Sequence, residues 1–204
     1  VSMRAAKTFL WVFSFFIFAS NAVAEDAGYA ICVSCHSPDG SGNVALNAPA
    51  IAGQETWYME TQLKNFKSGA RGVHESDIYG QQMRAMTLML ADDAAIASVS
   101  AYVSSMERKK VANTVEGNAD NGKALFAVCG GCHGPDAKGL KMMNSPDLTA
   151  QQDWYLVRQL QNFRTGVRGT DPSDMFGQQM RPMAMMLADD QAVKDVVAYI
   201  NTLH

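Results

Sequence analysis

Apolar residues along the chain recur with the spacing of one face of a helix. Residues 56–68 place Met59, Leu63 and Phe66 on one such face, and Gly69 directly after them is a typical helix stop. The pattern therefore predicts a helix over 56–68 whose apolar side packs against a core.

A second apolar stripe begins after two acidic residues. Asp92 or Asp93 can cap a helix, because a carboxylate accepts the free N–H groups of the first turn. The stripe behind this cap is Ile96, Val99, Val103 and Met106, and a later one with the same spacing is Val193, Val196, Ile200 and Leu203. Between 69 and 91 we expect an irregular, Met-rich segment. No stretch shows the sustained alternation of a strand, so the predicted fold class is all-α.

The second half of the chain repeats the first at a constant offset of 97 positions, from Cys32/Cys129 to Tyr102/Tyr199. Other matching pairs are Trp57/Trp154, Gln62/Gln159, Phe66/Phe163, Arg71/Arg168, Met83/Met180 and Asp92/Asp189. A period this long predicts two tandem domains rather than a solenoid. We place the N-terminal domain at 25–108, a charged linker at 109–118 and the C-terminal domain at 119–204.

Residues 1–24 have the features of a secretory signal. Arg4 and Lys7 precede an apolar run over 9–19, and small residues up to Ala24 suit cleavage after that position. An uncleaved membrane anchor is the alternative, although the run is shorter than the ~20 residues that span a bilayer. The chain has 17 Lys and Arg against 20 Asp and Glu, so it lacks the basic character of a nucleic-acid binder.

Two Cys-x-x-Cys-His motifs carry the candidate chemistry. They are Cys32, Cys35 and His36 in the first copy and Cys129, Cys132 and His133 in the second. This spacing places two thiols on one helical turn, where they can form thioethers to one haem, with the His beneath the iron. A redox dithiol does not call for the adjacent His, and a zinc site would need Cys pairs closer than 97 positions. Two motifs in repeat register behind an export signal therefore predict two covalently bound haem c groups.

These features resemble the diheme cytochrome c4 family of class I c-type cytochromes. The resemblance covers nearly all of 25–204, through the Cys-x-x-Cys-His motifs, the repeated Gln-Leu-x-Asn-Phe-x-x-Gly-x-Arg-Gly segment and the Leu-Ala-Asp-Asp before each last helix. It implies two tandem helical haem domains packed face to face. It also implies His36 and His133 as proximal iron ligands and electron transfer as the function.

The distal ligand has several Met candidates. Three positions repeat in both copies, which are Met83, Met86 and Met89 in the first and Met180, Met183 and Met186 in the second, with Met185 beside them. We set Met89 and Met186 aside as helix-abutting residues suited to core packing. The resemblance implies Met83 and Met180, seven positions before Leu90 and Leu187. Met86 and Met183 stay open, and so does His74 as a bis-His ligand of the first haem.

Further residues are candidates for holding the haem in place. Pro49 and Pro146 lie thirteen positions after their His, and they resemble the family proline whose carbonyl accepts from the His ring. Candidates for binding propionates or lining the cleft are Trp57, Trp154, Arg71, Arg168, Gln81, Gln178, Arg84 and Arg181. For the two Trp we favour helix packing.

The expected function is that of a periplasmic electron carrier rather than an enzyme, and a role as a fixed subunit of an oxidoreductase complex stays open. The partners implied are redox proteins such as a terminal oxidase, a cytochrome bc1-type donor or a dehydrogenase, with peripheral membrane association left open. A diheme peroxidase or a thiosulfate-oxidising cytochrome would need an exchangeable iron site. Both copies instead offer a Met, and all four Cys belong to the two motifs.

Overall fold

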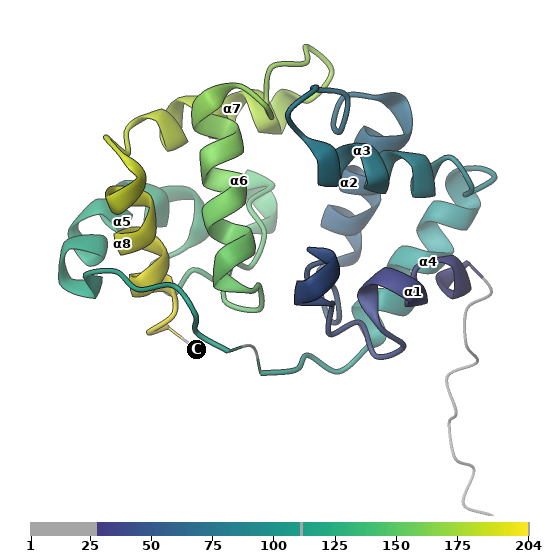
Figure 1. Ribbon diagram of the computed structural model, residues 1–204, viewed down its shortest axis with the longest axis horizontal. Helices are drawn as coiled ribbons and strands as arrows, with labels where there is room; N and C mark the ends of the chain where they lie inside the picture. Colours follow the sequence, from purple (N-terminus) through teal and green to yellow (C-terminus); the bar gives the residue numbers. More distant parts are fainter. Residues whose placement is uncertain (1–27, 111, 204) are drawn as a thin grey trace, which may run out of the picture.

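The computed structural model describes residues 28–110 and 112–203, which form two helical domains side by side (Figure 1). The N-terminal domain contains η1 (Tyr29–Ile31), α1 (Val33–His36), η2 (Val44–Leu46), α2 (Thr56–Ser68), α3 (Ile78–Thr87) and α4 (Asp93–Ser105). The C-terminal domain contains α5 (Ala119–His133), η3 (Lys141–Met143), α6 (Asp153–Thr165), α7 (Met175–Met185) and α8 (Asp190–Ile200). The described residues form no β-sheet, and the all-α prediction is confirmed.

Side-chain caps begin the helices where the sequence predicts them. The backbone N–H of Ala95 donates to the Asp92 carboxylate at 2.9 Å at the start of α4, and Asp189 caps α8 in the same way. Gly69 ends α2 in the left-handed region with φ of 89°, a conformation that most other residues adopt only with strain. The predicted helix over 56–68 is therefore confirmed at both ends.

The Met-rich segments are helical, which corrects the expectation of irregular chain. Asp77 begins α3 by accepting the N–H of Gly80 at 3.0 Å, and Asp174 begins α7 by accepting that of Gly177 at 3.0 Å. The sequence pattern misses these helices because their apolar residues are mainly Met at short range, without a long stripe. The candidate ligands Met83 and Met180 consequently lie on helices and not in free loops.

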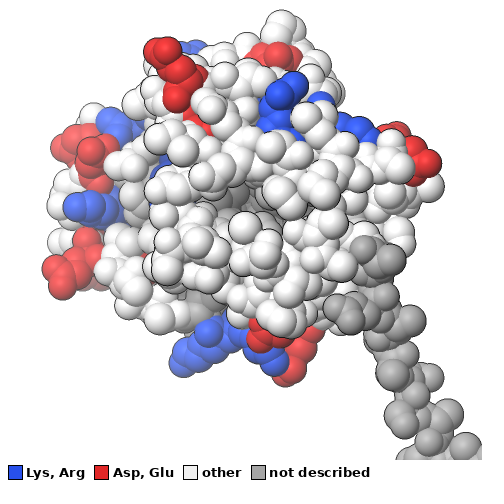
Figure 2. All heavy atoms as spheres, turned by 45° about the vertical axis from the view of Figure 1, so that its right-hand side comes forward, with Lys and Arg blue, Asp and Glu red and all other residues white. Residues whose placement is uncertain are grey.

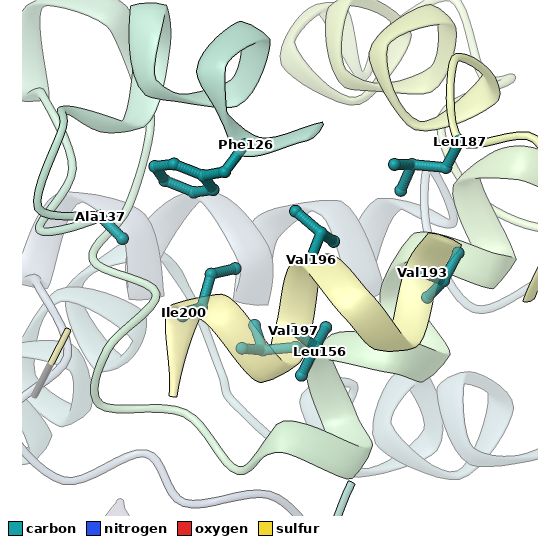
Figure 3. Close-up of a cluster of buried hydrophobic side chains, with 8 residues drawn as sticks. All are labelled: Phe126, Ala137, Leu156, Leu187, Val193, Val196, Val197 and Ile200. Atoms are coloured by element: carbon teal, nitrogen blue, oxygen red, sulfur yellow. The ribbon is translucent and has the colours of Figure 1, made fainter. Parts of the chain in front are cut away.

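The core of the C-terminal domain forms where α5 crosses α8 (Figure 3). Phe126 of α5 packs with Val193, Val196 and Ile200 of α8, and all four are buried. Gly122 permits the crossing, since a Cβ at that position would lie 1.9 Å from the carbonyl oxygen of Asp195. Leu203 packs on this core from beyond the end of α8. The N-terminal core has the matching composition: Tyr29, Met59, Leu63, Leu90, Ile96, Val99 and Val103.

Hydrogen bonds and an ion pair hold both ends of the segment that joins the two domains. Arg108 donates to the carbonyl of Gly53 at 2.9 Å and pairs with Asp147 of the other domain. Further on, Thr114 and Val115 donate to the buried carboxylate of Asp153 at the start of α6. The predicted signal and its cleavage after Ala24 lie outside the described residues, and the domain bounds stay predictions. No helix of the described residues is long and apolar enough to span a bilayer.

Candidate functional site

Each Cys-x-x-Cys-His motif is helical and borders a cavity, and in the first copy it forms the short α1 with Cys32 as its N-cap. In the C-terminal domain the motif occupies the last turns of α5, and Cys129, Cys132 and His133 line a cavity of about 190 Å³. In the N-terminal domain Cys32 and His36 line a smaller cavity of about 40 Å³. None of the four Cys forms a disulfide in the part of the chain that the structure describes. Among residues 28–110 and 112–203, no group of three or more His, Cys, Asp or Glu could hold a metal ion.

Both motif histidines are oriented by a proline carbonyl. His36 donates from Nδ1 to the carbonyl oxygen of Pro49 at 2.8 Å, and His133 does so to Pro146 at 3.1 Å. The expected proline contacts are thus present in both copies. Burial lowers the pKa of each His, against the opposite effect of the proline carbonyl. With Nδ1 donating to the carbonyl, each imidazole has a neutral Nε2, which is the nitrogen that a His so oriented can offer to a metal.

The Met candidates separate into cavity-lining and exposed residues. Met83 and Met86 line the N-terminal cavity, and Met180 and Met183 line the C-terminal one. The third pair, Met89 and Met186, is 61% and 60% exposed. The core-packing role expected for that pair is wrong, because each lies in the turn just after a helix and points to solvent.

Three remaining candidates, His74, Gln81 and Gln178, do not join the site. His74 lies in the exposed loop before α3, where its Nδ1 accepts from the backbone N–H of Ser76 at 3.2 Å. Gln81 and Gln178 are also exposed, and each donates to a carbonyl of the loop that precedes its own helix, at 2.8 and 2.9 Å. These contacts stabilise the loops and do not support the haem-lining role expected for the two Gln.

The domain boundary contains two buried Arg side chains that donate to amide and phenol oxygens. Arg71 donates to Gln62 of its own domain and to Tyr155 and Gln159 of the other, each at 2.8–2.9 Å. Arg168 donates to the same two Gln side chains at 2.8 Å. The result is a pseudo-symmetric cross of Arg and Gln side chains between α2 and α6.

Several buried donors have no hydrogen-bond partner among the described residues. They are the Nε atoms of Arg71, Arg84, Arg168 and Arg181 and the Nε1 of Trp154. Unpaired buried donors are costly, and a set of Arg Nε atoms matched in both repeats suits anionic acceptors. The two propionates of each haem supply such acceptors. The residues present therefore fit two haem groups.

The first domain completes the cavity of the second. Trp57, Tyr58, Thr61 and Gln62 of α2 line the C-terminal cavity together with that domain's own residues. Trp57 thus lies at the site rather than only in helix packing. The sequence pattern predicts that these residues lie on a helix. It does not predict that they contact the other domain, because a local pattern carries no information about contacts between domains.

Comparisons with known proteins agree with this architecture. The family model described as "Cytochrome c" matches residues 27–107 and again 119–204. "Cytochrome c4" of Azotobacter vinelandii is 32% identical over 201 residues, covering 91% of this chain and 90% of the relative. The "thiosulfate dehydrogenase electron acceptor" of Stutzerimonas stutzeri is 31% identical over 179 residues, covering 82% and 76%. The crystal structure of reduced cytochrome c4 from Pseudomonas stutzeri superposes with a TM-score of 0.68 at 30% identity, covering 88% of this chain and 98% of that one.

The chain belongs to the cytochrome c family, within its two-domain cytochrome c4 members. It is accordingly a diheme c-type cytochrome of electron transfer, with one covalent haem c for each Cys pair.

Proposed function

We propose that this protein is a periplasmic electron carrier that shuttles between respiratory donors and acceptors by outer-sphere transfer. The observation that carries the proposal is the same arrangement in two copies: a Cys pair, a carbonyl-oriented His and cavity-lining Met residues around one cavity. When bound, the haem iron supplies the one-electron chemistry. The protein supplies ligands, burial and a docking face.

The proposed ligands are His36 and Met83 in the N-terminal domain and His133 and Met180 in the C-terminal domain. The His contribution is supported by burial and by the proline carbonyl that holds each ring. The Met contribution is supported by the cavity linings and by the family spacing to Leu90 and Leu187. A thioether is a soft, neutral ligand that favours ferrous iron, so it suits a carrier of relatively high potential.

A closed iron site separates a carrier from an enzyme of the peroxidase type. Both copies provide cavity-lining Met residues, two in each domain, and no Cys remains outside the motifs. Neither site therefore needs to leave an iron position open to substrate. Export, with cleavage after Ala24, is supported by the charged and apolar segments of residues 1–24.

One face of the molecule suits transient docking. In Figure 2 the centre of this face is uncharged, while acidic and basic side chains lie around its edge. Short-lived redox complexes use small, weakly charged contacts of this kind. Candidate partners are a terminal oxidase, a cytochrome bc1-type donor or a dehydrogenase, in solution or at the membrane surface.

A narrower role has its own support. The Stutzerimonas stutzeri relative that is 31% identical over 82% of this chain is named a thiosulfate dehydrogenase electron acceptor. We therefore include thiosulfate dehydrogenase among the donors of this protein. Its redox role would then be that of a dedicated acceptor rather than a general shuttle.

The experiment is a stopped-flow transfer assay with the purified diheme protein. The oxidised protein is mixed with thiosulfate dehydrogenase and thiosulfate, and the reduced protein is mixed with membranes containing a terminal oxidase. We expect reduction in the first mixture and reoxidation in the second. Peroxide or thiosulfate turnover by the protein alone would contradict the carrier role.

A further inference from the structure

The two haem sites differ at one repeat position on the domain boundary. Thr61 of α2 lines the C-terminal cavity, beside Asn144 and Phe176. Ninety-seven positions later, α6 carries Arg158 where α2 carries Thr61. A neutral side chain that lines the C-terminal cavity is therefore matched, at the same repeat position, by a cation of α6.

Contacts of Arg158 place it against the N-terminal domain. Its guanidinium donates to the side chain of Asn47 and lies 4.4 Å from the ring centroid of Tyr79. Asn47 and Tyr79 are the repeat counterparts of Asn144 and Phe176, which line the C-terminal cavity. Arg158 thus meets the N-terminal domain at the position where Thr61 meets the C-terminal one.

The charge of Arg158 is not neutralised nearby. The guanidinium lies between two aromatic rings, with Trp154 at 4.9 Å and Tyr79 on the other domain. No carboxylate of the described residues lies within 4.0 Å of its nitrogens, since the ion pairs there involve other cations. The side chain is only partly exposed, so solvent screens its charge less than at an open surface.

We propose that Arg158, supplied by the C-terminal domain, raises the reduction potential of the N-terminal haem relative to the C-terminal one. Reduction adds one negative charge to a haem, and a fixed positive charge nearby stabilises that state. The inference rests on the proposed function, which places a redox-active haem in the N-terminal cavity. It assigns to Arg158 an effect on the haem reduction potential that the neutral Thr61, at the same repeat position in α2, does not have.

Three variants separate charge from packing. Arg158→Gln removes the charge and keeps an amide that can donate to Asn47, whereas Arg158→Lys keeps the charge and changes the shape. Thr61→Arg places a cation at the matching position of the other site. The readout is the pair of midpoints in a spectroelectrochemical titration of the full diheme protein. The Met83→Ala variant identifies the N-terminal midpoint, because loss of the Met ligand lowers it.

We expect R158Q to lower the N-terminal midpoint by about 59 mV, a tenfold change in its one-electron equilibrium, and to leave the other midpoint in place. R158K should stay close to the unmodified protein, and T61R should raise the C-terminal midpoint. Equal shifts in R158Q and R158K, a shift of the C-terminal midpoint in R158Q, or no shift would overturn the role of Arg158. Failure of the proposed function is seen separately, as the lack of a Met–iron band in the unmodified protein.

Discussion

Single residues decide how each iron site is built. His36 and His133 have the same burial and the same contact with a proline carbonyl. The Cys, His and Pro positions were predictable because they are close in sequence and repeat in register. The contacts of Trp57 and Arg158 across the domain boundary could not be predicted, since nothing in a local pattern encodes which residue faces another domain.

Replacing a proposed Met ligand tests the site at the scale of one side chain. We expect Met83→Ala or Met180→Ala to leave haem attached through its Cys pair but to make that iron high-spin and lower its potential, because the sixth ligand is lost. Absorption spectra and redox titration measure both effects. Met86→Ala and Met183→Ala are the matched controls. A low-spin spectrum in the first pair and a high-spin one in the controls would move the ligands to Met86 and Met183.

At the scale of elements, capping residues and glycines set where helices begin, end and cross. The sequence predicts that α2 ends at Gly69 and that Asp92 or Asp93 caps α4. Gly69 does end α2, and Asp92 is the cap of α4. The helices α3 and α7 were missed, although Asp77 and Asp174 cap them, because their short Met-rich pattern resembles a loop. A capping residue alone therefore does not predict a helix here, whereas a capping residue followed by an apolar stripe does.

The close crossing of α5 and α8 gives a prediction at this scale. In Gly122→Ala the added Cβ would overlap the carbonyl oxygen of Asp195, so α5 must move away from α8. We expect the free energy of unfolding of the C-terminal domain to fall by about 3 kcal/mol in urea denaturation. Lys123→Ala, at the exposed neighbouring position, should change it by less than about 0.5 kcal/mol. Equal stability of G122A and K123A would contradict the crossing.

For the whole molecule, the boundary between the domains is part of the C-terminal site. The Arg71–Gln62–Arg168–Gln159 cross joins α2 to α6, and α2 residues line the C-terminal cavity. The repeat predicted two equal domains. The completion of the C-terminal cavity by α2 depends on tertiary packing, and the smaller N-terminal cavity, lined by its own domain alone, shows that equal sequence positions do not produce equal sites.

A double-mutant cycle tests whether this boundary acts as one unit. Gln62 and Arg168 are joined by a 2.8 Å hydrogen bond across the two domains. We expect Gln62→Ala and Arg168→Ala to show a coupling energy of about 1–2 kcal/mol in urea unfolding, because either change leaves buried groups unpaired. The control is Gln62→Ala with Arg164→Ala, since Arg164 pairs with Asp190 within its own domain. Additive effects in both cycles would refute the coupled boundary.

The central claim is that both domains hold a closed His/Met iron site. The most direct measurement records the spectrum of the purified diheme protein and then adds carbon monoxide to its reduced form at neutral pH. We expect two low-spin haems per chain, a ferric Met–iron charge-transfer band with the intensity of two sites, and no rapid carbon monoxide binding. Rapid binding at both haems would contradict the claim, because it requires an iron position that no Met occupies.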